Sequence, residues 1–153
     1  MPKHTLIAAL CASAALLAAC GGGSTGPASV GGTWLYAAQS LTGSGLTCSI
    51  TSLTMSMQQT RTTVSGTTTG GNLACQDQQG GQATGTFNST DITGQLTSNN
   101  SITLEFGGTS FESTGTINSH TISGTSTVGL TLTDNNGGQT TVTIAGNFTA
   151  TKQ

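Results

Sequence analysis

Apolar residues recur at every second position through most of the chain after residue 33, which is the spacing of a strand with one buried face. No segment after this point shows the spacing of an amphipathic helix. The residues that share a face in this way are Leu53, Met55 and Met57; Ile102, Leu104 and Phe106; Ile122, Val128, Leu130 and Leu132; and Val142, Ile144 and Phe148. Threonines fill most of the opposite face in residues 120–133. The pattern therefore predicts a sheet whose strands each bury one side.

Glycine- and asparagine-rich pairs and triplets separate these runs and predict turns. The predicted strands cover residues 33–39, 46–59, 62–69, 72–77, 82–89, 91–98, 101–106, 109–117, 120–133 and 139–151. Such short loops force neighbouring strands to be antiparallel and paired in sequence order. We predict an all-β fold, an antiparallel up-and-down meander that closes into a barrel of about 8–10 strands. A β-sandwich is the alternative, although sandwiches usually need longer crossover connections.

A short pattern recurs in three of the predicted strands. Residues 64–67, 92–95 and 122–125 each read as a β-branched residue, a hydroxyl residue, a glycine and a polar residue. Glycine within a strand often marks a bend or a bulge. Recurrent bends are what a small closed barrel requires, so this repeat favours the barrel.

The N-terminus has the three parts of an export signal. Lys3 supplies a positive start, residues 6–17 form an uncharged apolar run, and Leu17-Ala18-Ala19-Cys20 follows. The run is too short for a membrane-spanning helix, which needs about 20 residues. An ordinary secretory cleavage site with an incidental cysteine is the alternative interpretation.

Leu17-Ala18-Ala19-Cys20 resembles the lipobox of bacterial lipoproteins. The resemblance implies diacylglyceryl transfer to the Cys20 thiol, cleavage after Ala19 and acylation of the new amine. Several acyl chains on one residue hold a protein stably at a membrane. Gly21 replaces the aspartate that retains many lipoproteins in the inner membrane, and this implies the outer membrane.

The sequence GGGSTGPAS after Cys20 has the composition of a flexible tether. We therefore divide the chain into a signal peptide (1–19), a lipidated cysteine with its tether (20–30) and a β-barrel domain (31–153). A mature protein of this kind would be exported to the cell envelope and would need no transmembrane helix.

Charge is scarce. Only 5% of the residues are charged, against roughly a quarter in typical soluble proteins. After removal of Lys3 with the signal, two cations face five acids, a formal charge of −3. The absence of a basic patch argues against nucleic acid as a partner.

Cysteine usage agrees with export. Cys11 leaves with the signal and Cys20 takes lipid, so Cys48 and Cys75 remain as an even pair. In an oxidising compartment such a pair predicts a disulfide. Their wide spacing is unlike a redox Cys-x-x-Cys motif, and no nearby histidine completes a zinc site.

Gly32-Thr33-Trp34, at the start of the first predicted strand, resembles the Gly-x-Trp opening of lipocalin-like and avidin-like barrels. Residues 64–67 and 92–95 are similar to avidin-like strands. The chain departs from both families: it has one tryptophan, where avidin-like pockets use several, and Lys152 is the nearest cation to the position of the arginine that closes lipocalin barrels. No ligand-contact residue is carried over.

The large apolar residues either line a ligand cavity in an open barrel or fill a small barrel completely. These candidate lining residues are Trp34, Met55, Met57, Phe87, Phe106, Phe111 and Phe148.

Other chemistry finds little support in the sequence. His120 is a lone histidine in a predicted turn, and Glu105 falls on the solvent face opposite its apolar neighbours, which argues against an acid pair with Glu112. Residues 134–138 resemble part of a calcium loop but carry one carboxylate, which favours a hairpin turn. We expect no catalytic residue, metal or cofactor. We expect instead a lipid-anchored protein that binds a small apolar ligand or a protein partner, or a structural surface lipoprotein with a filled barrel.

Overall fold

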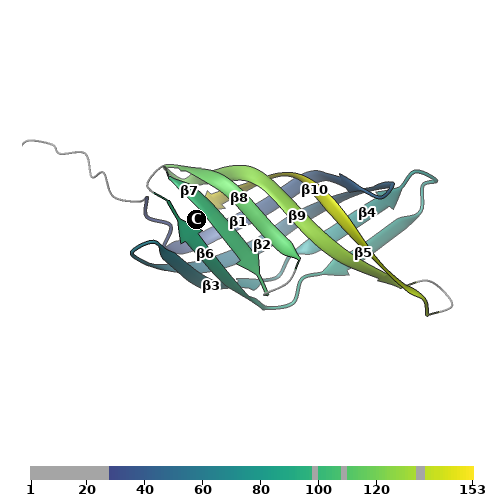
Figure 1. Ribbon diagram of the computed structural model, residues 1–153, viewed down its shortest axis with the longest axis horizontal. Helices are drawn as coiled ribbons and strands as arrows, with labels where there is room; N and C mark the ends of the chain where they lie inside the picture. Colours follow the sequence, from purple (N-terminus) through teal and green to yellow (C-terminus); the bar gives the residue numbers. More distant parts are fainter. Residues whose placement is uncertain (1–27, 98–99, 108–109, 134–136) are drawn as a thin grey trace, which may run out of the picture.

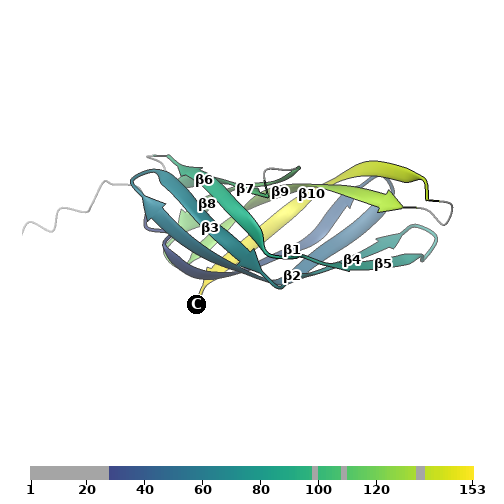
Figure 2. The same cartoon turned by 90° about the horizontal axis from the view of Figure 1, so that it is seen from below.

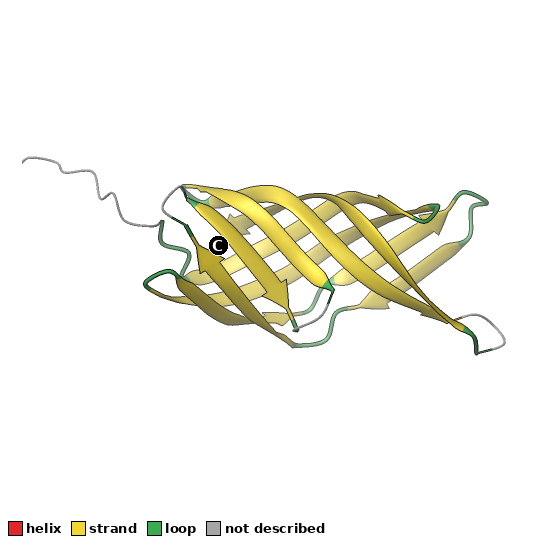
Figure 3. Ribbon diagram, in the orientation of Figure 1, coloured by secondary structure: helices red, strands yellow, loops and turns green. Residues whose placement is uncertain are grey.

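The computed structural model describes residues 28–97, 100–107, 110–133 and 137–153, and strands form nearly all of this part of the chain (Figures 1 and 3). The predicted signal peptide, Cys20 and the predicted tether up to residue 27 lie outside the described residues. The strands are β1 (Gly32–Gly43), β2 (Leu46–Thr60), β3 (Thr63–Thr69), β4 (Asn72–Asp77), β5 (Gln82–Thr86), β6 (Thr90–Leu96), β7 (Ser101–Phe106), β8 (Phe111–Asn118), β9 (Thr121–Thr133) and β10 (Gln139–Lys152). No helix in the described ranges is long and apolar enough to cross a membrane.

These ten segments make the eight strands of the barrel, of which β7 and β8 are short and the others long. β3 and β4 both pair antiparallel with β2, and the register of β3 (Thr54↔Thr69) continues into that of β4 (Thr51↔Asn72). β5 and β6 likewise follow each other along β4 and β3. β3 with β4 is therefore one interrupted strand, and β5 with β6 is the next.

The sheet closes on itself because β1 pairs with β10 on one side and with β2 on the other. Every pairing is antiparallel and follows sequence order around the ring. The structure confirms the predicted all-β meander and the barrel rather than the sandwich. The predicted strand limits hold closely, except that β1 continues to Gly43 and β5 ends before Phe87.

A transverse crease crosses four of the long strands. β1 and β2 shift register near Ser40 and Ser52, which both have a positive φ. β3 and β4 are separated by Gly70 and Gly71, at φ 66° and 102°, a backbone conformation that suits glycine. The fourth long strand is interrupted at residues 87–89. At each of these points the strand changes which residues face the interior. In β2, for example, even-numbered residues up to Ile50 face inward, and odd-numbered residues face inward from Leu53 onward.

The crease separates two halves that we call the closed half and the flared half. The closed half contains all eight strands, because β6, β7 and β8 lie there. β7 ends at Phe106 and β8 begins at Phe111, so only β5, β4, β2, β1, β10 and β9 continue into the flared half. The β4–β5 and β9–β10 hairpins extend past the ends of β7 and β8 and diverge at one end of the molecule in Figure 1; Figure 2 shows the same end from below.

The glycines of the recurrent pattern lie where strands approach closely. Gly66, Gly94 and Gly124 are all on the inward phase of their strands. A Cβ atom at Gly66 would lie 2.2 Å from the Ser56 carbonyl oxygen, and one at Gly124 would lie 2.0 Å from that of Thr114. A side chain at any of these positions would collide with the backbone of the neighbouring strand, which explains the repeated glycine.

The chain enters at the end of the closed half. Val30 is fully buried there, and the Trp34 Nε1–H donates to the Val30 carbonyl at 2.8 Å. Lys152, the cross-strand partner of Trp34, places its Nζ 5.5 Å from the centroid of the indole ring. This cation–π contact occupies the end of the barrel where the lipocalin resemblance implied an arginine.

Candidate binding site at the open side of the barrel

The seven candidate lining residues all face the interior, but most of them fill it. Trp34, Met55, Met57, Phe106 and Phe148 are at most 3% exposed, and Phe111 is 6% exposed. Phe87, in the linker between β5 and β6, is the half-buried member. Side chains thus fill the closed half. The apolar pocket described below lies at its border with the flared half.

Three buried hydroxyl groups hydrogen-bond to one another at the centre of this packing. The Tyr36 hydroxyl lies 3.2 Å from Ser113 Oγ and 2.5 Å from Ser126 Oγ, and the two serine oxygens are 2.5 Å apart. A hydroxyl both donates and accepts, so the three groups can satisfy each other in a ring. Burial raises the pKa of Tyr36, and the hydrogen bonds with Ser113 and Ser126 partly offset that rise.

Aromatic rings surround the three hydroxyls. The Tyr36 ring stacks on Phe148 with centroids 5.1 Å apart and meets Phe106 and Phe111 edge-on at 5.8 and 5.9 Å. Phe106 and Phe111 stack at 4.1 Å, and Phe111 lies 5.8 Å from Phe87. The rings therefore run from the filled interior to the open side of the barrel.

Sequence analysis missed this group of hydroxyls, although its signal was present. Tyr36 lies two residues after Trp34 and so shares its face. Ser113 and Ser126 lie on the inward-facing, apolar side of their strands. Ser113 is two residues after Phe111, and Ser126 is two residues before Val128. A polar side chain on the buried face of a strand requires a hydrogen-bond partner there. That requirement can be recognised from the sequence.

A half-open apolar pocket lies where β7 and β8 stop. Its volume is about 220 Å³. Its walls come from both sides of the opening, with Phe87 on one side and Leu130 on the other, and Phe106 and Phe111 at its base. The remaining lining residues are Leu53, Thr68, Thr90, Gly107, Val128 and Gly129. Apart from two threonine hydroxyls, the lining side chains are apolar.

The predicted disulfide between Cys48 and Cys75 is confirmed. The two cysteines are direct cross-strand partners on β2 and β4 and face inward in the flared half. The bond ties the β4–β5 hairpin to the long strand β2. It therefore supports the side of the opening that carries β5.

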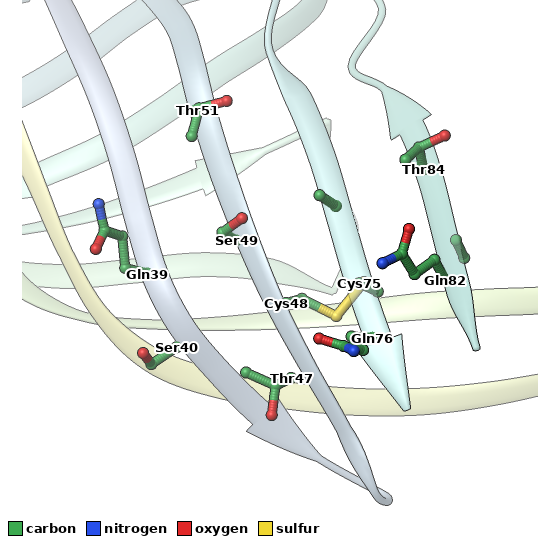
Figure 4. A pocket seen from close by; sticks show the side chains of 12 residues that line it. Gln39, Ser40, Thr47, Cys48, Ser49, Thr51, Cys75, Gln76, Gln82 and Thr84 are labelled. Atoms are coloured by element: carbon green, nitrogen blue, oxygen red, sulfur yellow. A yellow bond between two sulfur atoms is a disulfide. The ribbon is translucent and has the colours of Figure 1, made fainter. Parts of the chain in front are cut away.

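A second, wider hollow of about 480 Å³ lies on the outer face beside the disulfide (Figure 4). Most of its lining side chains are amides and hydroxyls, including Gln39, Ser49 and Gln76, and the rest are two alanines and the disulfide. The polar groups are open to water, and a side-chain hydrogen bond from a ligand would replace one to water, with a net contribution of about 0.5–1.5 kcal/mol. The smaller apolar pocket is the better candidate, because burial of apolar surface is the dominant favourable term in binding.

The other candidate residues lie apart from this pocket. His120 is exposed in the turn before β9, with its Nδ1 3.1 Å from Ser119 Oγ. Glu105 and Glu112 are direct cross-strand partners, and both side chains are exposed on the outer face, as predicted for Glu105. The predicted turn at 134–138 begins with residues outside the described part. Among the described residues, no group of three or more histidine, cysteine or acidic side chains is placed to hold a metal ion.

Comparison with known proteins adds no relative: no family model matches the chain, and no curated protein matches it.

Proposed function

We propose that this protein is an exported, lipid-anchored, non-enzymatic barrel of the bacterial cell envelope that binds an apolar group at its open side. The observation that carries the proposal is the apolar pocket between Phe87 and Leu130, at the place where two of the eight strands end. Aromatic and aliphatic side chains that remain half-exposed there gain free energy when a ligand covers them, about 25 cal/mol per Å² of apolar surface.

The position of the chain's entry supports a tethered arrangement. Residues 28–31 pack at the end of the closed half, whereas the β4–β5 and β9–β10 hairpins lie at the other end. A lipid on Cys20 would hold the closed half near the membrane and leave the open side accessible. The Cys48–Cys75 disulfide agrees with an oxidising, exported compartment.

The anchor is tested by Cys20→Ala. The variant is expected to leave the membrane fraction, whereas Cys11→Ala, a change within the signal, is expected to leave the mature protein in that fraction. Persistent membrane attachment of Cys20→Ala would refute the anchor.

The ligand-binding role is tested with an apolar fluorescent dye and a matched pair of variants. Leu130 and Leu132 are half-buried on the same face of β9, but only Leu130 lines the pocket. Leu130→Gln is expected to weaken dye binding about tenfold, because it places an amide in the apolar wall. Leu132→Gln is expected to bind as the wild type does. Equal dye binding by both variants would exclude this pocket as the site.

The packing of the closed half favours a second candidate, a structural surface lipoprotein with a filled barrel. Native mass spectrometry of the protein taken from its own membrane separates the two. A retained apolar ligand or partner supports binding, and a bare chain that also ignores the dye supports the structural role.

A further inference from the structure

The edge of β5 that faces the opening has free backbone groups. Phe87 N–H donates to the Gly71 carbonyl at 3.0 Å, and Asp77 N–H donates to that of Gly81 at 2.9 Å. Hydrogen bonding alternates along an antiparallel pair, so the odd-numbered residues of β5 bond to β4. The N–H and C=O groups of Gln82, Thr84 and Thr86 therefore point away from β4, into the opening.

On the facing edge of β9, the backbone beyond Gly129 makes no hydrogen bond to a described residue of β8. Gly129 N–H donates to the Ser110 carbonyl at 2.7 Å, which is the last backbone bond on the β8 side of β9 among the described residues. By the same alternation, Thr131 and Thr133 direct their backbone groups into the opening. Two free strand edges thus border one gap in the barrel wall.

The β5 edge lacks the features that protect natural edge strands. Proteins usually block such edges with charged side chains, proline or a bulge. β5 reads Gln-Ala-Thr-Gly-Thr, all five residues are exposed, and its pairing with β4 is regular over its whole length. An exposed, uncharged edge of this kind accepts another strand.

The apolar pocket is suited to one side chain of such a strand. Its volume of about 220 Å³ is below the range of about 300–1,000 Å³ typical of sites for whole small molecules. The pocket adjoins the end of β5, because Phe87 directly follows that strand. On the inward side of β5, a Cβ atom at Gly85 would meet nothing within 4 Å, so inward side chains of an added strand have room.

We propose that the open side of the barrel binds an extended, uncharged segment of a partner polypeptide, which adds antiparallel to the free edge of β5 and places one apolar side chain in the pocket. Main-chain hydrogen bonds to Gln82, Thr84 and Thr86 would supply affinity, and the pocket would supply specificity. This inference rests on the proposed function, since it names the class of ligand for the same pocket.

A second copy of the chain fits this edge less well. Two identical strands that pair antiparallel are related by a two-fold axis normal to the sheet, and this operation reverses the long axis of the barrel. The closed halves, where both chains enter, would then lie at opposite ends of the pair. Two copies held by short tethers on one membrane cannot adopt that arrangement, which leaves a strand of another protein.

The test uses a blocked, uncharged seven-residue peptide in which threonine alternates with valine and a phenylalanine stands at the centre. Its threonines would align with the outward-facing Gln82, Thr84 and Thr86, and its apolar residues would face the pocket. A second peptide carries N-methyl groups on the threonines and therefore loses its donors to β5. Binding is measured by peptide fluorescence anisotropy on the soluble Cys20→Ala chain, together with binding of the apolar dye.

Thr84→Pro is the matching change in the protein, with Thr84→Ala as its control. Proline removes the Thr84 N–H, which points into the opening and makes no bond to β4, and proline is tolerated at strand edges. We expect Thr84→Ala to bind the peptide as the wild type does, and Thr84→Pro to bind about tenfold more weakly, the effect of one lost hydrogen bond of about 1.4 kcal/mol. The N-methylated peptide is expected to lose at least as much affinity. Dye binding is expected to be the same in all three proteins.

Each other outcome overturns the strand-addition proposal. If the peptide fails to bind while the dye binds, the pocket takes small molecules and the proposed function stands. If neither binds, both proposals fail. If N-methylation or Thr84→Pro has no effect, backbone pairing is excluded. If the wild type sediments as a dimer and Thr84→Pro as a monomer, a second copy occupies the edge.

Discussion

The closed and flared halves of the barrel share several long strands but differ in how many strands surround the interior. Eight strands pair around a full ring in the closed half, so every strand edge is covered and the interior excludes water. Six strands continue into the flared half, where β5 and β9 each keep a free edge and aliphatic side chains remain half-exposed. The loss of two strands therefore opens one side of the barrel, although Leu41, Cys48 and Ile144 remain buried in the flared half.

The two halves also differ in how they are stabilised. Stacked aromatic rings and a ring of buried hydroxyls hold the closed half, whereas a covalent bond between Cys48 and Cys75 holds the flared half. Small cores commonly rely on disulfides where burial is insufficient. The disulfide therefore adds a covalent link on the side of the crease that lacks the aromatic packing.

A matched pair of leucine substitutions gives the largest expected contrast. Leu104 is fully buried in the closed half, and Leu104→Ala is expected to lower the free energy of unfolding by about 2–5 kcal/mol. Leu132 is half-buried in the flared half, and Leu132→Ala is expected to cost about 1 kcal/mol, since less surface returns to water. Urea unfolding followed by tryptophan fluorescence measures both values. Equal costs would mean that the two halves are equally packed.

Removal of the disulfide should weaken mainly the flared half. The two cysteines are 27 residues apart, and the chain-entropy model gives a stabilisation of about 3.5 kcal/mol for a loop of that length. Cys48→Ala/Cys75→Ala is expected to lose up to this amount in urea unfolding. Amide exchange in β4 and β5 is expected to accelerate more than in β7 and β8, and a uniform acceleration would contradict the division into halves.

Substitutions in the ring of hydroxyls should have non-additive effects on the free energy of unfolding. Tyr36→Phe removes one hydroxyl and leaves the other two with one fewer partner, at an expected cost of about 1–2 kcal/mol in the free energy of unfolding. A triple change, Tyr36→Phe/Ser113→Ala/Ser126→Ala, leaves no buried hydroxyl in the ring. Its cost should be far below three times the single cost, and a strictly additive triple would show that the groups act independently.

The smallest effect concerns stability at high pH. Burial raises the pKa of Tyr36 above its ordinary value of 10.0, so the unfolded chain loses this proton at a lower pH than the folded protein does. The free energy of unfolding therefore falls as the pH rises above about 10. Tyr36 is the only tyrosine in the sequence, so tyrosinate absorbance reports it alone. A titration at the ordinary pKa in the folded protein, or an unchanged pH slope in Tyr36→Phe, would contradict this prediction.

The regular part of the fold followed from the sequence because side-chain alternation and turn residues are local signals. Both determined the strands, their order and the closure of the meander, and the pairing of Cys48 with Cys75 followed from the count of cysteines. The glycines within strands lie where neighbouring backbones approach closely, but the register shifts lie elsewhere, near Ser40 and Ser52.

The candidate site could not be predicted from the sequence, because it depends on the lengths of neighbouring strands relative to one another. That β7 and β8 stop short of their neighbours becomes visible only when Phe106 and Phe111 are placed beside Leu130 and Phe87. The crease was also hidden, since Ser40 and Ser52 are not residues that signal a bulge. The seven candidate lining residues had been grouped by size, which does not separate the filled interior from the one half-buried ring, Phe87.

Residue-resolved hydrogen exchange on the native protein tests the difference between the halves most directly. We expect slow exchange through β7, β8 and the rest of the closed half. On β5 it predicts an alternation in which Ala83 and Gly85 are protected by β4, while Gln82, Thr84 and Thr86 exchange rapidly; Thr131 and Thr133 of β9 should also exchange rapidly. Equal protection along β5 and β9, matching that of β7 and β8, would contradict the open side on which the proposed binding depends.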